Sequence, residues 1–190
     1  PSWSFAFPAR ACPQTARHDL SREFVGVVRQ QIVITVNAIM HIREANLSDI
    51  EAIAALHTHS WRTTYRGVLS DAYLDTELFA ERKALWLERF THPTPTQYIA
   101  VAEVSQTLVG LACAYGDHNV RWGSLLENLH VAQGHKGAGL GAQLVRHIAQ
   151  WCARTQSSPG LHLWVLAPNK AAQGFYQRLG ANPVEEAIWD

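Results

Sequence analysis

The alternation of hydrophobic and polar positions along the chain predicts a mixed α/β domain. Apolar or alternating runs bounded by turn residues predict strands at 39–43, 97–104, 108–115, 125–131 and 161–166. Apolar residues recurring every three to four positions predict helices at 50–60, 77–90, 139–154 and 169–179. Ser48 and Glu51 have the spacing of a capping box at the start of the first helix. This order of elements predicts one sheet with helices on both faces.

A glycine-rich stretch lies between the strand at 125–131 and the helix at 139–154. Residues 136–141 read Lys-Gly-Ala-Gly-Leu-Gly. Glycines at such a junction let backbone N–H groups turn toward one point, and the helix adds its own unpaired N–H groups and the positive end of its dipole. The stretch therefore predicts a site for a phosphate or pyrophosphate group.

Two common phosphate loops fit this stretch poorly. A Walker A loop ends in Gly-Lys-Ser or Gly-Lys-Thr, and neither follows these glycines. The dinucleotide fingerprint matches at Gly137, Gly139 and Ala142, but it also requires an acidic residue about 20 positions further on. No Asp or Glu occurs between Asn128 and Val184, so we do not favour a nicotinamide or flavin dinucleotide.

The pyrophosphate of coenzyme A is the third interpretation. Leu129-x-Val131, four residues and then the glycine stretch resemble motif A of the GNAT superfamily of N-acetyltransferases. Residues 169–180, which read Asn-Lys-Ala-Ala-Gln-Gly-Phe-Tyr-Gln-Arg-Leu-Gly, resemble motif B of the same superfamily. The resemblance covers about residues 40–190. It implies a mixed, mostly antiparallel central sheet with helices on both faces, and acetyl-CoA as the cofactor.

The resemblance also implies which residues contact the cofactor. The sheet of this family opens between its fourth and fifth strands, here 125–131 and 161–166. Backbone groups of 129–131 are then expected to pair with the pantetheine arm, and those of 136–142 to hold the pyrophosphate. The expected contacts are Leu129, His130, Val131, Lys136, Gly137, Ala138, Gly139, Leu140, Gly141, Ala142, Asn169 and Tyr176. Lys136 stands where the family usually has Arg or Gln, so a planar fork is replaced by a point charge.

Two side chains are candidates for proton transfer. An amine acceptor must lose a proton before it attacks, and Glu127 is a candidate general base. Side chains alternate between the two faces of a strand, so Glu127 is expected on the same face as Leu129 and Val131. His130, a second candidate, is expected on the opposite face. Tyr176 resembles the motif B tyrosine of the family, which implies a general acid for the leaving thiolate. Each residue also has a purely structural interpretation, as a solvent-facing or packing side chain.

The acceptor site is expected between the first two helices. Trp61 and Tyr65 lie one helical turn apart and resemble part of a Trp-x-x-x-Tyr-x-Gly-Leu stretch in some uncharacterised bacterial members. The two residues predict either an apolar wall of the acceptor site that also carries hydrogen-bonding groups, or core packing of the first helix. The acceptor is a small amine, a peptide or a protein N-terminus, which the sequence leaves open.

Composition and charge exclude several other classes. The net charge is zero, so no overall field favours nucleic acid or a membrane surface as a partner. Five basic residues and no acids occur between Asn128 and Val184, which suits a polyanionic cofactor. Cys12, Cys113 and Cys152 show no disulfide or metal spacing, which favours a reduced cytoplasmic location. His57 and His59 lack a third metal ligand nearby, so no metal site is expected.

The two ends of the chain depart from the family. Residues 40–190 are expected to form the acetyltransferase domain, with residues 1–39 an extension of uncertain origin. After the last helix the family has two strands, whereas this chain has room for one, and Ala181 replaces an aromatic residue. A missing strand leaves an open sheet edge. We expect residues 25–36, which are rich in β-branched side chains, to fill it in the same chain or from a homodimer partner.

The sequence therefore predicts an N-acetyltransferase that transfers an acetyl group from acetyl-CoA to a primary amine by direct attack in a ternary complex. The alternative is a non-catalytic or degenerate module that binds acyl-CoA but turns over no acceptor. Glu127 and Tyr176 discriminate the two, because a pure binder needs neither.

Overall fold

The structure is a computed structural model of the 190-residue chain, and it describes residues 2–7, 40–157 and 160–188. Its strands are β1 (Ser2–Phe7), β2 (Met40–Glu44), β3 (Gln97–Val104), β4 (Thr107–Asn119), β5 (Gly123–Val131), β6 (Leu161–Leu166) and β7 (Asn182–Ala187). Its helices are α1 (Ile50–Thr64), α2 (Leu78–Thr91), α3 (Leu140–Thr155) and α4 (Lys170–Arg178). Short helical turns η1 (Leu47–Asp49), η2 (Tyr73–Glu77) and η3 (Gln133–His135) precede α1, α2 and α3.

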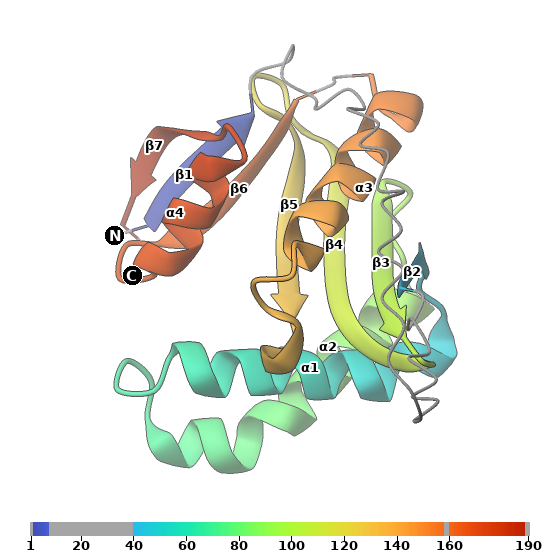
Figure 1. Ribbon diagram of the computed structural model, residues 1–190, viewed down its shortest axis with the longest axis vertical. Helices are drawn as coiled ribbons and strands as arrows, with labels where there is room; N and C mark the ends of the chain where they lie inside the picture. Colours follow the sequence, from blue (N-terminus) through green and yellow to red (C-terminus); the bar gives the residue numbers. More distant parts are fainter. Residues whose placement is uncertain (1, 8–39, 158–159, 189–190) are drawn as a thin grey trace, which may run out of the picture.

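The seven described strands form one sheet in the order β2-β3-β4-β5-β6-β1-β7. Every neighbouring pair is antiparallel except β5 and β6. Helices α1 and α2 cover one face over β3 and β4, and α3 and α4 cover the other face (Figure 1). The fold class and the two-sided covering predicted from the sequence are confirmed.

Two hydrophobic cores fill the space on either side of the sheet. The larger lies under α3 and α4 and includes Leu144, Ile148 and Tyr176. The smaller lies under α1 and α2 and is built around Ile53 and Trp86, both with no exposed surface. Helix α3 has its apolar residues on one stripe, as the periodicity predicted, and the long strands β3 and β4 are buried on both faces.

Strands β5 and β6 touch only at one end. Their parallel pairing is limited to Ser124 with Leu161 and Leu125 with His162, after which the strands separate (Figure 1). The contact end is held tightly, because the Ser124 N–H donates to the Gly160 carbonyl at 2.9 Å. Gly123 has φ +79°, and a Cβ there would lie 2.3 Å from the Gly160 oxygen, so only glycine fits this apex.

The first described strand lies beside the last one in the sheet. In the described part of the chain β7 is the one strand after α4, and β1 lies between β6 and β7 with antiparallel pairing to both. Phe5 of β1 is 2% exposed and joins the core under α4. The expectation that residues 25–36 fill this position concerns a segment outside the described residues, and the strand found there is β1.

The capping box lies two residues earlier than predicted. The capping side chain is that of Asn46, not Ser48, and it accepts the backbone N–H of Ser48 at 2.9 Å. The second side chain of the box is Asp49, not Glu51, and it accepts the backbone N–H of Asn46 at 2.8 Å. The prediction was wrong because a short turn, η1, precedes α1 and takes over the cap. Asp49 is additionally fixed by Arg43 of β2, whose guanidinium holds the pKa of that carboxyl below its usual range.

We predict that Phe5→Ala destabilises the protein by about 3 kcal/mol or more, because it removes a large buried side chain from a strand inside the sheet. Urea unfolding measures this, with Leu87→Ala at an exposed position of α2 as the control. Equal, small effects of the two substitutions would show that β1 is not an integral strand.

Candidate functional site

The open end of the gap between β5 and β6 exposes one edge of β5. The N–H of Ala132 donates to the Val109 carbonyl of β4 at 2.8 Å. Alternate residues of an antiparallel strand bond to the same neighbour, so the polar backbone groups of His130 also face β4. Those of Leu129 and Val131 therefore face the gap, where β6 has moved away. The gap thus offers backbone donors and acceptors to an extended, amide-bearing ligand.

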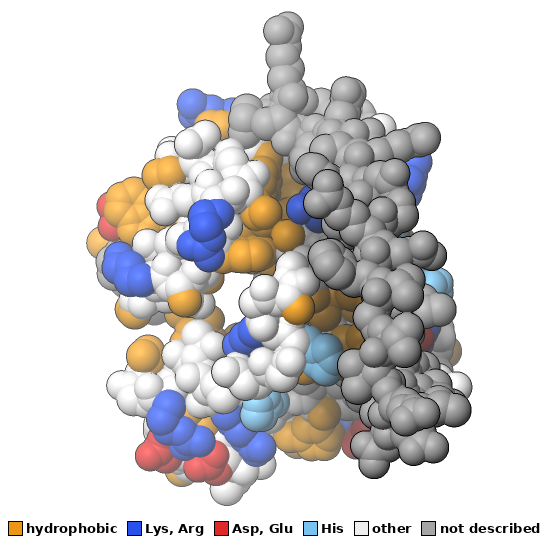
Figure 2. Space-filling view, viewed as in Figure 1, with side chains coloured by type: hydrophobic (Ala, Val, Ile, Leu, Met, Phe, Trp, Pro, Cys, Tyr) orange, Lys and Arg blue, Asp and Glu red, His pale blue; other side chains and the backbone are white. Residues whose placement is uncertain are grey.

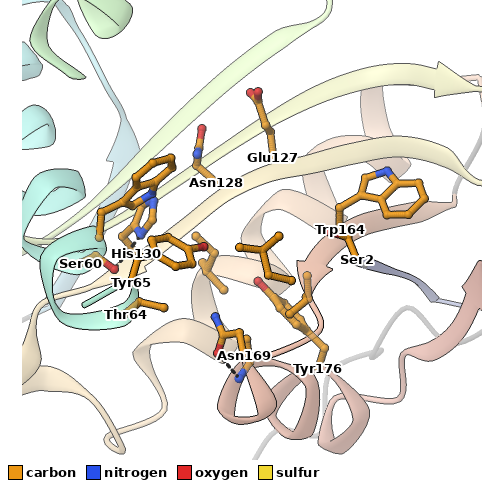
Figure 3. A pocket seen from close by; sticks show the side chains of 15 residues that line it. Ser2, Ser60, Thr64, Tyr65, Glu127, Asn128, His130, Trp164, Asn169 and Tyr176 are labelled. Carbon is orange, nitrogen blue, oxygen red and sulfur yellow. Dashed lines mark hydrogen bonds between the residues drawn. The ribbon is translucent and has the colours of Figure 1, made fainter. Parts of the chain in front are cut away.

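A bulge in β5 changes the direction of the side chains near the gap. Cys113 pairs with Asn128 and Ala114 with Leu126, which leaves Glu127 as the extra residue. Leu126 and Leu129 therefore both pack on the α3 side, whereas Glu127 and Asn128 point together toward α2 (Figure 3).

The prediction that Glu127 shares a face with Leu129 and Val131 was therefore wrong. It assumed unbroken alternation, and the bulge inserts one residue. The predicted opposition of Glu127 and His130 is wrong for the same reason, since His130 contacts Ser60 of α1 on the same side.

Arg89 of α2 holds the bulge in place. Its guanidinium donates to Glu127 Oε2 and to Asn128 Oδ1, both at 2.7 Å. The same group lies 4.8 Å from the ring of Trp86, which adds a cation–π contact. The Arg89 side chain is only 12% exposed, so the ion pair is partly shielded from water. A proton taken by Glu127 must weaken this pair.

The glycine stretch forms a cradle where α3 begins. Gly137 and Gly139 have φ near +80°, and a Cβ at either would meet open space. Helix α3 starts at Leu140 with no side-chain cap and no acid in its first turn. Its first N–H groups are thus available to an anion. Gly141 serves packing as well, because a Cβ there would lie 3.2 Å from the Phe175 ring of α4.

Two cavities open on the gap, each of about 450 Å³. The glycine-loop cavity is lined by Val131, His135, Lys136, Gly137, Gly141, Phe175 and Arg178, among others. The bulge cavity is lined by Ser2, Trp61, Tyr65, Glu127, Asn128 and Trp164, among others. The two share Ser60, Thr64, Leu129, His130, Asn169, Ala172 and Tyr176. Figure 2 shows the surface hollowed between α4 and α1, with basic side chains nearby.

Most of the predicted site residues meet in these cavities. Leu129, His130, Val131, Lys136, Gly137, Gly141, Asn169 and Tyr176 line the glycine-loop cavity, whereas Ala138, Gly139, Leu140 and Ala142 do not. The Leu140 side chain is 3% exposed and belongs to the core. Asn169 caps α4, as predicted, by accepting the Ala172 N–H at 3.1 Å. Trp61 and Tyr65, expected in the acceptor site, line the bulge cavity with ring centroids 5.1 Å apart.

Several lining residues were not predicted. Ser60, Thr64, Trp164 and Ser2 carry no motif, and the contribution of β1 depends on strand order. Arg178 could have been suggested by one feature of the sequence, because it belongs to the basic stretch between Asn128 and Val184 that contains no acid.

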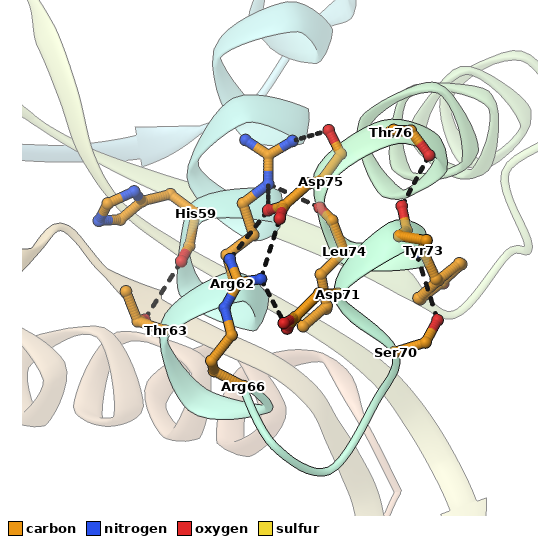
Figure 4. Close-up of polar contacts among 11 residues, drawn as sticks. His59, Arg62, Thr63, Arg66, Ser70, Asp71, Tyr73, Leu74, Asp75 and Thr76 are labelled. Atoms are coloured by element: carbon orange, nitrogen blue, oxygen red, sulfur yellow. Dashed lines mark hydrogen bonds and ion pairs between the residues drawn. The ribbon is translucent and has the colours of Figure 1, made fainter.

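A polar network fixes the segment that carries Tyr65. Arg66 donates to Asp71 and Asp75, and Arg62 donates to the carbonyls of Leu74 and Asp75 (Figure 4). These contacts tie the end of α1 to η2 across a tight loop. Tyr65, between the two arginines, is thereby held in the wall of the bulge cavity. Its burial raises the pKa of the phenol, which keeps it neutral.

His57, which is fully buried, stacks on His130, which lines both cavities. Their ring centroids lie 4.4 Å apart. Trp86 Nε1 donates to His57 Nδ1 at 3.1 Å, so His57 carries its proton on Nε2. His130 Nδ1 lies 3.0 Å from Ser60 Oγ. Burial, together with nearby positive charge, lowers the pKa of His57 to about 2 and that of His130 to about 4.

Tyr176 lies at the junction of the two cavities and is 8% exposed. Burial raises the pKa of its phenol well above the usual value, so the hydroxyl keeps its proton at neutral pH. The two described cysteines lie away from both cavities. Cys113 is buried, which raises the pKa of its thiol to about 12. A thiol held neutral in this way is a poor nucleophile.

Comparison with known proteins identifies the family. The acetyltransferase (GNAT) family profile matches residues 53–181, well over half of the chain, and the chain belongs to that family. An uncharacterized N-acetyltransferase of Bacillus subtilis, YobR, is 26% identical over 132 residues, which are 68% of this chain and 51% of YobR. A probable N-acetyltransferase of Mycobacterium tuberculosis is 26% identical over 73% of this chain and 78% of its own length. The chain thus spans about half of YobR, and its match to a second B. subtilis relative, YuaI, covers 28% of that protein.

Solved structures show the same fold. An aminoglycoside N-acetyltransferase in complex with CoA aligns with a TM-score of 0.63 at 18% identity, over 83% of this chain and 97% of that one. An N-acetyltransferase of Thermoplasma acidophilum in complex with coenzyme A aligns with a TM-score of 0.59 at 17% identity, over 74% and 87%. None of the helices in the described part of the chain is long and apolar enough to cross a membrane.

We predict that Gly139→Ala weakens binding of CoA about tenfold or more, because a methyl group enters the space above the cradle. The strain of an alanine at φ +83° costs about 1 kcal/mol of stability. Gly67→Ala is the matched control, since Gly67 has φ +80° and open space but lies in the loop after α1. Calorimetric titration with CoA measures the affinity of both variants. Equal affinities of the two variants for CoA would contradict the role of the glycine cradle in binding.

The histidine stack predicts a loss of stability in mild acid. Unfolded histidine binds a proton near pH 6.5, whereas folded His130 does so only near pH 4. The contribution of His130 to the free energy of unfolding is therefore complete above pH 6.5. As the pH is lowered from 6.5 to 4, this contribution decreases by up to about 1.4 kcal/mol per pH unit. We expect His130→Gln to flatten the pH dependence of urea unfolding, and His59→Gln at the exposed surface of α1 to leave it unchanged.

Proposed function

We propose that the protein is an N-acetyltransferase that transfers the acetyl group of acetyl-CoA to a primary amine bound at the same time. The observation that carries this proposal is the pair of cavities that meet at Leu129, Asn169 and Tyr176. One cavity has the cradle for a pyrophosphate, and the other has aromatic walls and a carboxylate. A donor and an acceptor bound in the two cavities would meet at their junction.

The residues of the glycine-loop cavity suit coenzyme A. The cradle at 137–142 fits the pyrophosphate, and Lys136 and Arg178 add positive charge at the same cavity. The edge of β5 at Leu129 and Val131 fits the amides of the pantetheine arm. When bound, acetyl-CoA supplies an activated acetyl group and a thiol leaving group. Two solved structures in complex with coenzyme A share this fold.

Direct attack by the amine is the mechanism that the side chains support. A covalent acetyl-enzyme needs a reactive nucleophile, and the two cysteines among the described residues, Cys113 and Cys152, are buried away from both cavities. Glu127, in the bulge cavity, accepts the proton of the amine directly or through a water molecule, because its side chain is 37% exposed. Tyr176, kept protonated by burial, donates its hydroxyl proton to the departing thiolate.

A second candidate is a binding module that performs no transfer. The contact of Glu127 with Arg89 favours it, because a carboxylate held by a guanidinium gives up that contact when it accepts a proton. In this alternative Tyr176 is a packing residue of the core under α3 and α4, since a binder needs no acid at the junction.

Steady-state measurement of thiol release from acetyl-CoA tests the proposal, with a panel of primary amines as acceptors. Intersecting initial-velocity patterns are expected for a ternary complex, whereas parallel lines would indicate a covalent acetyl-enzyme. Tight binding of acetyl-CoA without release above the hydrolysis background for any amine would favour the binding module.

We predict that Tyr176→Phe lowers kcat about 100-fold while the affinity for acetyl-CoA changes little, because only the proton donor is lost. Tyr98→Phe is the control, since its hydroxyl contacts His147 of α3, away from both cavities. Unchanged kcat in Tyr176→Phe would remove this residue from the mechanism.

A further inference from the structure

The bulge cavity carries little net charge. Among the described residues that line it, Glu127 is the one acidic side chain, and none is Lys or Arg. Glu127 is itself paired with Arg89 at 2.7 Å. The cavity therefore offers one carboxylate, already partly compensated, to an incoming ammonium group.

Positive charge lies directly behind the cavity wall. The Arg82 guanidinium is 4.8 Å from the ring of Trp61, on which it makes a cation–π contact. Arg82 also lies close enough to His130 to contribute to its lowered pKa. Together with Arg89, it places two guanidinium groups near a cavity that contains one carboxylate. Arg82 is itself paired with Glu81 and Arg89 with Glu127, so this region holds no surplus negative charge that would attract an acceptor with several positive charges.

Most of the other acids near α1 are already paired. Asp71 and Asp75 bind Arg66, with Asp75 also near Arg62 (Figure 4). Glu51 pairs with Lys83, and Glu81 pairs with Arg82. The many acids of this part of the sequence therefore do not form a second anionic subsite beside the bulge cavity.

Aromatic and apolar side chains form the rest of the wall. Trp61 and Tyr65 stand edge to face on α1, and Trp164 of β6 lies on the opposite side of the cavity (Figure 3). Trp164 pairs across the strands with the small residue Ser4, and Leu166 pairs with Ser2, so β1 supplies space for the indole and closes this end. A cavity of this size and lining suits a small molecule with a flat or aliphatic body.

We propose that the acceptor is a small primary amine with a single positive charge and an aromatic or aliphatic body, of the arylalkylamine type, and that polyamines and aminoglycosides are poor acceptors. This inference rests on the proposed function. The single carboxylate, Glu127, receives the amino group at the junction, and the three aromatic side chains hold the body of the acceptor.

The test compares acceptors on the full chain. Thiol release from acetyl-CoA is measured with 2-phenylethylamine, spermidine and kanamycin, and kcat/KM for 2-phenylethylamine is expected to exceed the other two by about tenfold or more. Titration of the same amines into the CoA-saturated protein gives a second readout. Preference for spermidine or kanamycin in either measurement would overturn the inference and leave the acetyltransferase activity standing.

The two proposals fail in different ways. Selective binding of 2-phenylethylamine without acetyl transfer would contradict the proposed function and support the charge and shape argument. Acetylation of all three amines with equal kcat/KM would contradict the inference alone. Neither binding nor transfer of any amine by a protein that binds CoA would overturn both.

Variants of Trp164 locate the selectivity. Trp164→Ala is expected to lower kcat/KM for 2-phenylethylamine about tenfold through KM, with the KM for acetyl-CoA unchanged, because the aromatic contact is lost. Trp164→Phe should restore most of this loss while preserving the fold. Trp122→Ala, at the turn between β4 and β5 and outside both cavities, is the matched control. Equal KM values in Trp164→Ala and wild type would exclude Trp164 from the acceptor site.

Discussion

The separation of β5 from β6 is the constraint on which the rest of the molecule depends. At one end Gly123 and Gly160 bring the strands together more closely than any side chain allows. At the other end the strands part; there the bulge at Glu127 bonds to Arg89 of α2, and β1 pairs with the far edge of β6. The polar edge of β5 is thereby left without a strand partner inside an otherwise continuous sheet. An amide-bearing ligand satisfies that edge as a strand would.

The two cavities and the histidine stack follow from this geometry. The glycine cradle at the start of α3 lies at the open end of the gap, so an anion held there directs the rest of its molecule along β5. The bulge turns Glu127 away from the α3 side and into the neighbouring cavity, where Trp61, Tyr65 and Trp164 provide apolar walls. Tyr176 reaches the junction from α4 on the opposite face. One irregularity in one strand thus separates the donor side from the acceptor side.

Much of the fold and the cradle could be predicted from the sequence, whereas the orientation of the candidate base could not. The glycines at 137–141 and the Asn169 cap depend on local backbone requirements, which short sequence patterns record. The bulge at Glu127 depends on pairing with β4 and on Arg89, which lies 38 residues away along the chain. Similarly, β1 lies between β6 and β7 through long-range pairing with both, and its sequence of six residues carries no sign of these partners. Local signals therefore predicted elements, while long-range pairing determined the acceptor side.

Residue-specific amide hydrogen exchange with and without acetyl-CoA tests the central claim most directly. The N–H groups of Leu129 and Val131 face the gap, whereas that of His130 faces β4. Acetyl-CoA is predicted to slow exchange strongly at Leu129 and Val131, and to slow His130 only as much as other β4-bonded amides of β5. Uniform protection along β5, or no change at Leu129 and Val131 under saturating acetyl-CoA, would contradict the claim that the unpaired edge of β5 receives the cofactor.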